Sequence, residues 1–120
     1  MDKVTIDDSL ASIREPWRPQ VIASLNGQEV KTVKLLGEFV WHHHEEEDEL
    51  FLVWRGRLRM EFRDRTVELG PGEMIVVPRG TEHRPVAIGE VEILLFEPQC
   101  VRNTGNVVDP KLTAPANAHP

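Results

Sequence analysis

Three consecutive histidines, His42 to His44, are the residues of this sequence whose types and spacing could do chemistry. On an extended strand successive side chains point to opposite faces, so His42 and His44 would share a face and His43 would point the other way. The carboxylate of Glu49 follows after a short acidic connection and opens the next apolar run. Two imidazoles and one carboxylate form a partial metal shell, which suits zinc, nickel, iron, manganese or copper without choosing among them.

A second stretch supplies a further histidine. Gly72 precedes an apolar run that ends at a tight turn marked by Pro78 and Gly80, and His83 follows this turn. Proline and glycine at such positions are typical of turns between strands. The chain therefore holds two separate segments that combine turn signals with metal-binding residue types.

Taken together, the two segments resemble the two motifs of the cupin superfamily. The residues that carry the resemblance are Gly37, His42, His44, Glu49 and Gly56 in the first motif and Gly72, Pro78, Gly80 and His83 in the second. Their order, types and intervals agree from Gly37 to about Glu97, so the match is far more specific than either half alone. The sequence departs from the common pattern in the spacing between Gly37 and His42, which is one residue short, and at Ala87, where an asparagine is usual.

The resemblance implies a small antiparallel jelly-roll barrel with a metal inside, toward one end. The family's metal ligands fall on His42, His44, Glu49 and His83. His43 stays outside this shell, in agreement with the alternation argument. The implied cofactor is one divalent transition metal ion, either iron, manganese, nickel or zinc.

Strand and turn signals independently predict an all-β fold with one short helix before Pro16. Asn26-Gly27 is the strongest hairpin signal, and turns or breaks are also expected at Arg55-Gly56 and at Gly89. The expected strands cover 17–23, 29–35, 38–44, 49–54, 57–63, 66–69, 74–77, 84–88 and 90–96. We expect an N-terminal helical segment at 1–16, the barrel at 17–98, and a C-terminal tail at 99–120 that is poor in core residues. This tail is either disordered or an arm on a neighbouring surface.

Length and charge narrow the class of protein. The chain of 120 residues is one domain, and its formal net charge of −6 argues against nucleic acid and anionic membranes as partners. No apolar run approaches the roughly 20 residues that span a bilayer. The single cysteine, Cys100, cannot form an internal disulfide, which favours a cytoplasmic protein.

The side chains expected to point into the barrel are apolar. They are Phe51, Val53, Met60, Phe62 and Val76. We therefore predict an apolar pocket whose main polar feature is the metal, suited to an aromatic or short-chain oxygenated ligand rather than to a highly hydroxylated sugar.

Three functions remain open at this point. The chain is a small metal-dependent enzyme of dioxygenase or isomerase type acting on a small molecule, a non-catalytic module that binds a small ligand, or a barrel whose metal is purely structural. The segment 49–54 is apolar on both faces, so its outer face needs a cover. A homodimer is the commonest symmetric solution and is expected here.

Overall fold

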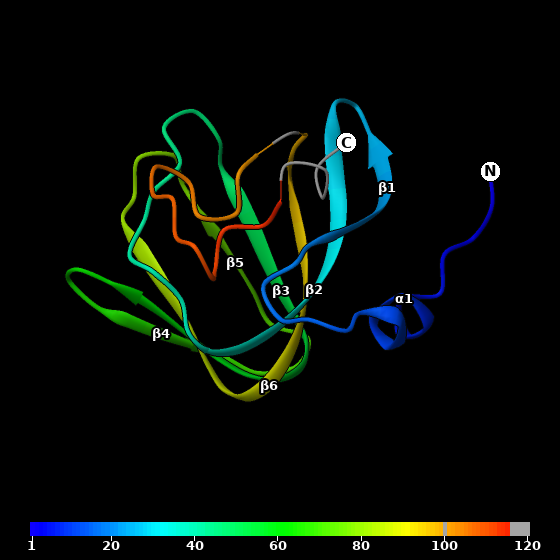
Figure 1. Ribbon diagram of the computed structural model, residues 1–120, viewed down its shortest axis with the longest axis horizontal. Helices are drawn as coiled ribbons and strands as arrows, with labels where there is room; N and C mark the ends of the chain where they lie inside the picture. Colours follow the sequence, from blue (N-terminus) through cyan, green and yellow to red (C-terminus); the bar gives the residue numbers. More distant parts are fainter. Residues whose placement is uncertain (100, 116–120) are drawn as a thin grey trace.

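The computed structural model describes residues 1–99 and 101–115, which form six antiparallel strands and one short helix (Figure 1). Helix α1 spans Ile6–Ser12, and the strands are β1 (Gln20–Leu25), β2 (Gln28–Glu38), β3 (Glu49–Phe62), β4 (Thr66–Leu69), β5 (Met74–Val77) and β6 (His83–Pro98). The sheet has the order β1-β2-β6-β3-β4, and β5 also pairs with β3. The predicted all-β fold with a short N-terminal helix is confirmed.

Strands β3 and β6 are the two longest of the barrel, and the sequence had predicted each of them as two shorter strands. The breaks expected at Arg55-Gly56 and at Gly89 are wrong, because the chain continues through both positions within β3 and β6. The register between these strands shifts on either side of Arg55, which marks a bulge. A Cβ atom on Gly56 would lie 2.8 Å from the backbone oxygen of Glu90, so glycine here permits close approach of the two strands.

The first hairpin follows the sequence signal. Asn26 and Gly27 adopt φ values of 51° and 75° and join β1 to β2, with Leu25 opposite Gln28. The predicted start of this strand at position 17 is wrong: Trp17 has a φ of 62°, which is incompatible with a strand, and β1 begins only at Gln20.

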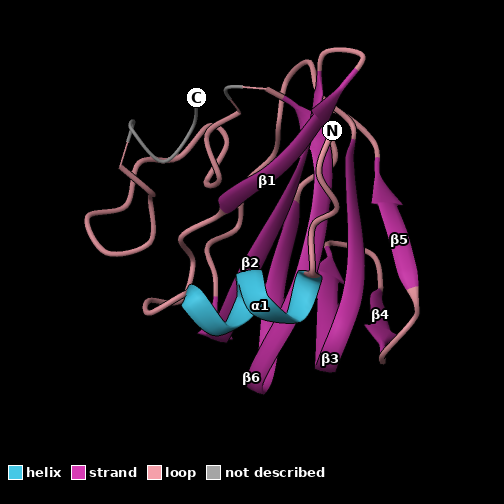
Figure 2. Ribbon diagram, turned by 90° about the vertical axis from the view of Figure 1, so that its right-hand side faces the viewer, coloured by secondary structure: helices cyan, strands magenta, loops and turns pink. Residues whose placement is uncertain are grey.

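The core fills the barrel from the inward faces of β2, β3 and β6. Alternate residues of these strands are buried, among them Val33, Phe51, Val53 and Ile93. Burying one such side chain stabilises the fold by roughly 1.5–3 kcal/mol. Helix α1 lies on the outside of the sheet (Figure 2) and contacts β2, where Ser9 Oγ and Thr32 Oγ1 are 2.7 Å apart.

Strand β5 differs from the buried strand that was predicted. Val77 lies opposite Glu49 and is buried, whereas Met74 and Val76 are 56% and 49% exposed. Because β5 covers only one face of the core, its alternate side chains must point outward. The prediction that Val76 lines the interior is therefore corrected.

The segment 101–115, orange to red in Figure 1, contains no helix or strand but folds back over the barrel. Its Asn103 side chain donates hydrogen bonds to the backbone oxygens of Trp17 and Leu112 and accepts one from the Ala114 backbone. The surface on which this arm lies is therefore the chain's own barrel. Cys100 and the end of the predicted tail, 116–120 with His119, lie outside the described residues.

Candidate metal centre

The loop between β2 and β3 carries two of the four predicted metal ligands, His42 and His44. The strand expected at 38–44 is wrong, because β2 ends at Glu38 and residues 39–48 form an irregular connection. Within this loop His42 pairs with His83 at the start of β6: the backbone nitrogen of each donates to the oxygen of the other, at 3.0 and 2.9 Å. This bridge brings the two sequence motifs together.

The structure places the four predicted metal ligands in one buried cluster, which we term the histidine–glutamate cluster: His42, His44, Glu49 and His83. One ligand atom from each residue lies within 4.8 Å of the others. Glu49 Oε1 is 3.4 Å from His44 Nε2 and 3.5 Å from His83 Nε2. His43 is not part of the cluster, as the sequence predicted.

Backbone carbonyls orient two of the imidazole rings. Nδ1–H of His42 donates to the oxygen of Val40, and Nδ1–H of His83 donates to the oxygen of Thr81, both at 2.9 Å. With Nδ1 protonated, Nε2 of each neutral ring keeps a lone pair. This second hydrogen bond is the usual device by which proteins orient metal-binding histidines.

Three buried polar atoms of the cluster have no hydrogen-bond partner within the part of the chain that the structure describes: His44 Nε2, His83 Nε2 and Glu49 Oε1. An unsatisfied buried polar atom costs about 1–3 kcal/mol, so such a group calls for a partner. A cation between them would satisfy all three at once. Neutral imidazoles with one carboxylate are donors that fit zinc, iron, manganese or nickel.

The protonation states also suit a cation. Burial and the neighbouring His83 lower the pKa of His42 to about 4, which leaves this ring neutral at pH 7. Burial opposes ionisation of Glu49, but its contacts with His44, His83 and Glu97 hold its pKa well below the ordinary value. Burial likewise opposes charging of His44, yet its contact with Glu49 raises the pKa of this ring. A metal binds the deprotonated forms of these groups and would displace the proton from His44.

Sequence reasoning missed a second set of buried polar residues, Glu29, Lys31 and Glu97, each at most 2% exposed. They extend the polar interior beyond the metal ligands, since Glu97 lies beside Glu49 across β6 and β3. Burial and the neighbouring Glu49 carboxylate raise the pKa of Glu97 well above its ordinary value. The signal was present: Glu29 and Lys31 share strand parity with Val33 and Leu35, which are buried.

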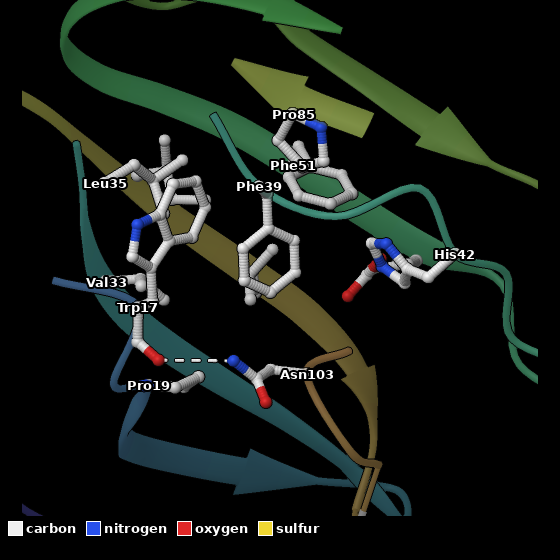
Figure 3. Close-up of a pocket in the computed structure, with 12 residues that line it drawn as sticks. Trp17, Pro19, Val33, Leu35, Phe39, His42, Phe51, Pro85 and Asn103 are labelled. Atoms are coloured by element: carbon white, nitrogen blue, oxygen red, sulfur yellow. Dashed lines mark hydrogen bonds between the residues drawn. The ribbon is translucent and has the colours of Figure 1, made fainter. Parts of the chain in front are cut away.

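An apolar cavity adjoins the cluster, with His42 at one end (Figure 3). Glu49 also lines this cavity. Phe39 lies between Trp17, whose ring stacks on it at 4.3 Å, and His42, whose ring is 5.3 Å away. The centre of a water-sized sphere can move through about 30 Å³ of this cavity, which is room for roughly two water molecules.

The five residues predicted to line a pocket are divided among the cavity, the closed core and a surface depression. Phe51 lines this cavity, whereas Val53 and Met60 are fully buried in the core and do not border it. Phe62 and Val76 border a separate, open depression beside β5. The sequence missed Trp17, Phe39 and Asn103, because Trp17 and Phe39 were assigned to strands, although both lie outside the strands that form, and Asn103 was assigned to the tail.

Comparison with known proteins identifies the class. Residues 31–97, more than half of the chain, match the cupin domain family (Cupin_2). The chain therefore belongs to the cupin family. Its structure is similar to that of a cupin-2 domain containing protein from Shewanella frigidimarina, with 43% identity, a TM-score of 0.79, and coverage of 80% of this chain and 94% of the other.

Two further relatives are similar over different lengths. The protein NMB1881 from Neisseria meningitidis is 32% identical with a TM-score of 0.75, covering 81% of this chain and 99% of that chain. The uncharacterized protein YdbB from Bacillus subtilis is 39% identical over 64 residues, which are 52% of this chain and 57% of that protein. The chain thus spans just over half the length of this curated relative.

Proposed function

We propose that this chain binds one divalent transition metal at the histidine–glutamate cluster and acts with it on a small oxygenated molecule in the adjoining cavity. The observation that carries this proposal is the set of buried, unsatisfied ligand atoms in a cluster whose members His42 and Glu49 border an apolar cavity. A bound metal would supply Lewis acidity and, if redox-active, chemistry with dioxygen. We accordingly favour an enzyme of dioxygenase or isomerase type over a ligand-binding module or a structural metal.

The residues of the cavity would exclude water and orient the ligand. Leu35, Phe51 and Leu95 form apolar walls, and His42 and Glu49 face the same space. The cavity as it stands holds only a few atoms, so a larger ligand requires displacement of Trp17 or Asn103, which are joined by a hydrogen bond of 3.2 Å. The ligand class that fits is small and apolar, with an oxygen to meet the metal.

The matched pair Leu35→Phe and Leu36→Phe tests the ligand class. Leu35 lines the cavity, whereas its neighbour Leu36 is 53% exposed. We expect benzoate to change the absorption spectrum of the cobalt(II)-loaded protein at concentrations at least tenfold below those at which glucose does. Leu35→Phe should raise the benzoate concentration needed by a further factor of about ten, since one displaced group in an apolar pocket is worth roughly 1–3 kcal/mol.

Two results would count against this ligand class: glucose acting as well as benzoate, or equal behaviour of the two phenylalanine variants. Oxygen uptake by the iron-loaded protein, measured over a panel of small aromatic and short-chain oxygenated compounds, separates the enzymatic branches. Stimulated uptake favours the dioxygenase, and its absence favours isomerisation or binding.

We also propose that the chain forms a homodimer through the outer face of β3, β5 and β6. Two rows of cross-strand neighbours lie on this face, Val76–Leu50–Phe96 and Met74–Leu52–Leu94. Met74 and Val76 are about half exposed, and apolar surface of this kind is typical of interfaces. A second copy of the same face would cover it by two-fold symmetry.

The mass in solution tests the dimer. Light scattering should give twice the chain mass at micromolar concentration, and Val76→Glu should shift it toward the monomer. Val108→Glu is the control, because Val108 is exposed but belongs to the C-terminal segment. A monomer mass for the unmodified protein at every concentration would contradict the proposal.

The remaining expectations stand as proposals on their original grounds. The barrel spans 17–98 between the segments 1–16 and 99–120. We place the protein in the cytoplasm, with neither nucleic acid nor membrane as a partner, because of its acidic charge and its single cysteine. Among the described residues, no helix has the length and apolar character needed to cross a membrane.

A further inference from the structure

A buried lysine lies inside the barrel beside the histidine–glutamate cluster. The side chain of Lys31 is fully buried, and its Nζ atom is 2.9 Å from Glu97 Oε1 and 3.7 Å from Glu29 Oε1. Lys31 projects from β2 and Glu97 from β6, on the same inward face as Val33 and Leu95. The ion pair therefore spans two neighbouring strands in the layer next to the metal ligands.

Stability alone does not account for this arrangement. Removing a lysine and carboxylates from water costs several kcal/mol per ion, and a buried ion pair is often no more stabilising than apolar residues of similar size. The rest of the barrel interior is packed with apolar side chains, including Val33, Phe51 and Leu95. A charged group here therefore needs a reason beyond filling the core.

The position of Glu97 supplies that reason. Glu97 Oε1 accepts a hydrogen bond from Lys31 Nζ, and Glu97 lies beside Glu49 on the neighbouring strand, because the adjacent residues Phe96 and Leu50 pair across β6 and β3. Glu49 in turn contacts His44 and His83. Lys31, Glu97 and the candidate metal ligand Glu49 thus lie in series across β2, β6 and β3.

We propose that Lys31 and Glu97 are positioning residues for the metal centre: Lys31 fixes the Glu97 carboxyl, and Glu97 fixes the Glu49 carboxylate in the orientation that a metal requires. This inference rests on the proposed metal site. Partners that hold a metal ligand from behind contribute about 10- to 100-fold to metal affinity in other proteins. Glu97 is not among the four residues whose ligand atoms lie within 4.8 Å of one another, so its effect on the metal would pass through Glu49.

A double-mutant cycle on Lys31→Met and Glu97→Gln tests this relay. The readouts are the dissociation constant for zinc(II), measured by competition with a chelator, and the absorption spectrum of the cobalt(II) form, which reports coordination geometry. We expect each single variant to weaken zinc binding about tenfold and to change the cobalt spectrum. Because both residues act through one contact, the double variant should lose no more than the weaker-binding single variant.

Lys34→Met is the matched control. Lys34 lies three residues along the same strand on the opposite face, where it approaches Glu90 at 4.0 Å on the surface. Its replacement should leave the zinc affinity and the cobalt spectrum unchanged. Thermal unfolding of each metal-free variant separates a loss of fold from a loss of metal affinity. If Lys31→Met does not fold, the nearly isosteric Glu97→Gln carries the test alone.

Distinct outcomes overturn the two proposals. Failure of the unmodified protein to bind metal removes the metal site and this inference together. Normal binding by the unmodified protein, with Glu97→Gln or Lys31→Met binding equally well, overturns only the inference. Tighter binding by Lys31→Met also overturns it, because the lysine would then act merely by repelling the cation. Additive losses in the double variant would show that the two residues do not act through one another.

Discussion

Replacing His44 by alanine is expected to weaken zinc binding about one hundred- to several hundredfold, whereas replacing the adjacent His43 by alanine leaves it unchanged. His44 contributes one of the four converging ligand atoms, and His43 contributes none. Zinc binding to a four-ligand site contributes roughly 10–16 kcal/mol, so one ligand carries about 2.5–4 kcal/mol, which corresponds to a factor of about one hundred to several hundred. Competition with a chelator of known affinity measures both dissociation constants.

The two variants are well matched, because they change the same residue type at neighbouring positions of one loop. The ring of His43 forms a hydrogen bond with Glu45 at the surface, so its loss removes a contact of little value to the fold. Equal weakening in both variants would mean that the loop as a whole matters rather than the cluster. Weakening by His43→Ala alone would place the metal elsewhere.

Gly105→Ala is expected to lower the free energy of unfolding by about 2–4 kcal/mol, because a positive φ costs a residue with a Cβ atom about 1 kcal/mol and overpacking costs about 1–3 kcal/mol more. Gly105 has a φ of 55°, and a Cβ atom there would lie 2.2 Å from the backbone oxygen of His43. Neither backbone can yield without breaking the contact between the arm and the metal-binding loop, in which Asn106 and His43 exchange hydrogen bonds. Urea unfolding of the metal-free protein measures the loss.

Gly89→Ala is the control for this prediction. Gly89 also has a positive φ, 73°, but no atom lies within 4 Å of the position its Cβ would take. The free energy of unfolding of Gly89→Ala should fall only by the cost of a positive φ in alanine, about 1 kcal/mol. Zinc affinity should fall in Gly105→Ala, because the loop with His42 and His44 must shift, and should stay constant in Gly89→Ala. Equal stabilities of the two variants would show that the arm does not brace the loop.

The four candidate ligands could be predicted from the sequence, even though the segment that holds His42 and His44 was predicted as a strand and forms a loop. The alternation argument assumed that His42 and His44 lie on a strand, yet both lie in a loop. They still converge because the bridge between His42 and His83 fixes the loop against β6. The matching spacing in the two motifs predicted this convergence, whereas periodicity alone predicted the wrong element.

Glycine signals explain two of the errors in the strand boundaries, the breaks expected at Gly56 and Gly89. A glycine that permits a positive φ serves a turn and a bulge equally well, and Gly56 and Gly89 belong to bulges within long strands. Asn26-Gly27 was decisive only because two residues that favour a positive φ are adjacent. Distinguishing the two cases requires the partner strand, which one sequence does not provide.

Composition alone did not predict that residues 101–115 pack on the barrel or that charged side chains are buried inside it. Few apolar residues occur in 101–115, yet Asn103 and Thr104 hold this segment through side-chain hydrogen bonds. Lysine is expected at the surface. Strand parity with Val33 and Leu35 pointed to an inward Lys31, but only the partner strand reveals that it faces Glu97. Both cases depend on contacts between residues far apart in the chain.

The metal content of the purified protein tests the central claim most directly. Protein prepared without added metal, and the same protein after loading with zinc, iron, manganese or nickel and removal of the excess, should be analysed by mass spectrometry of the elements. We predict one equivalent of a divalent metal per chain, lost when His42 and His44 are both replaced by alanine in a protein that remains folded. A folded protein that holds no metal under any loading condition, or a double variant that keeps its metal, would contradict the assignment.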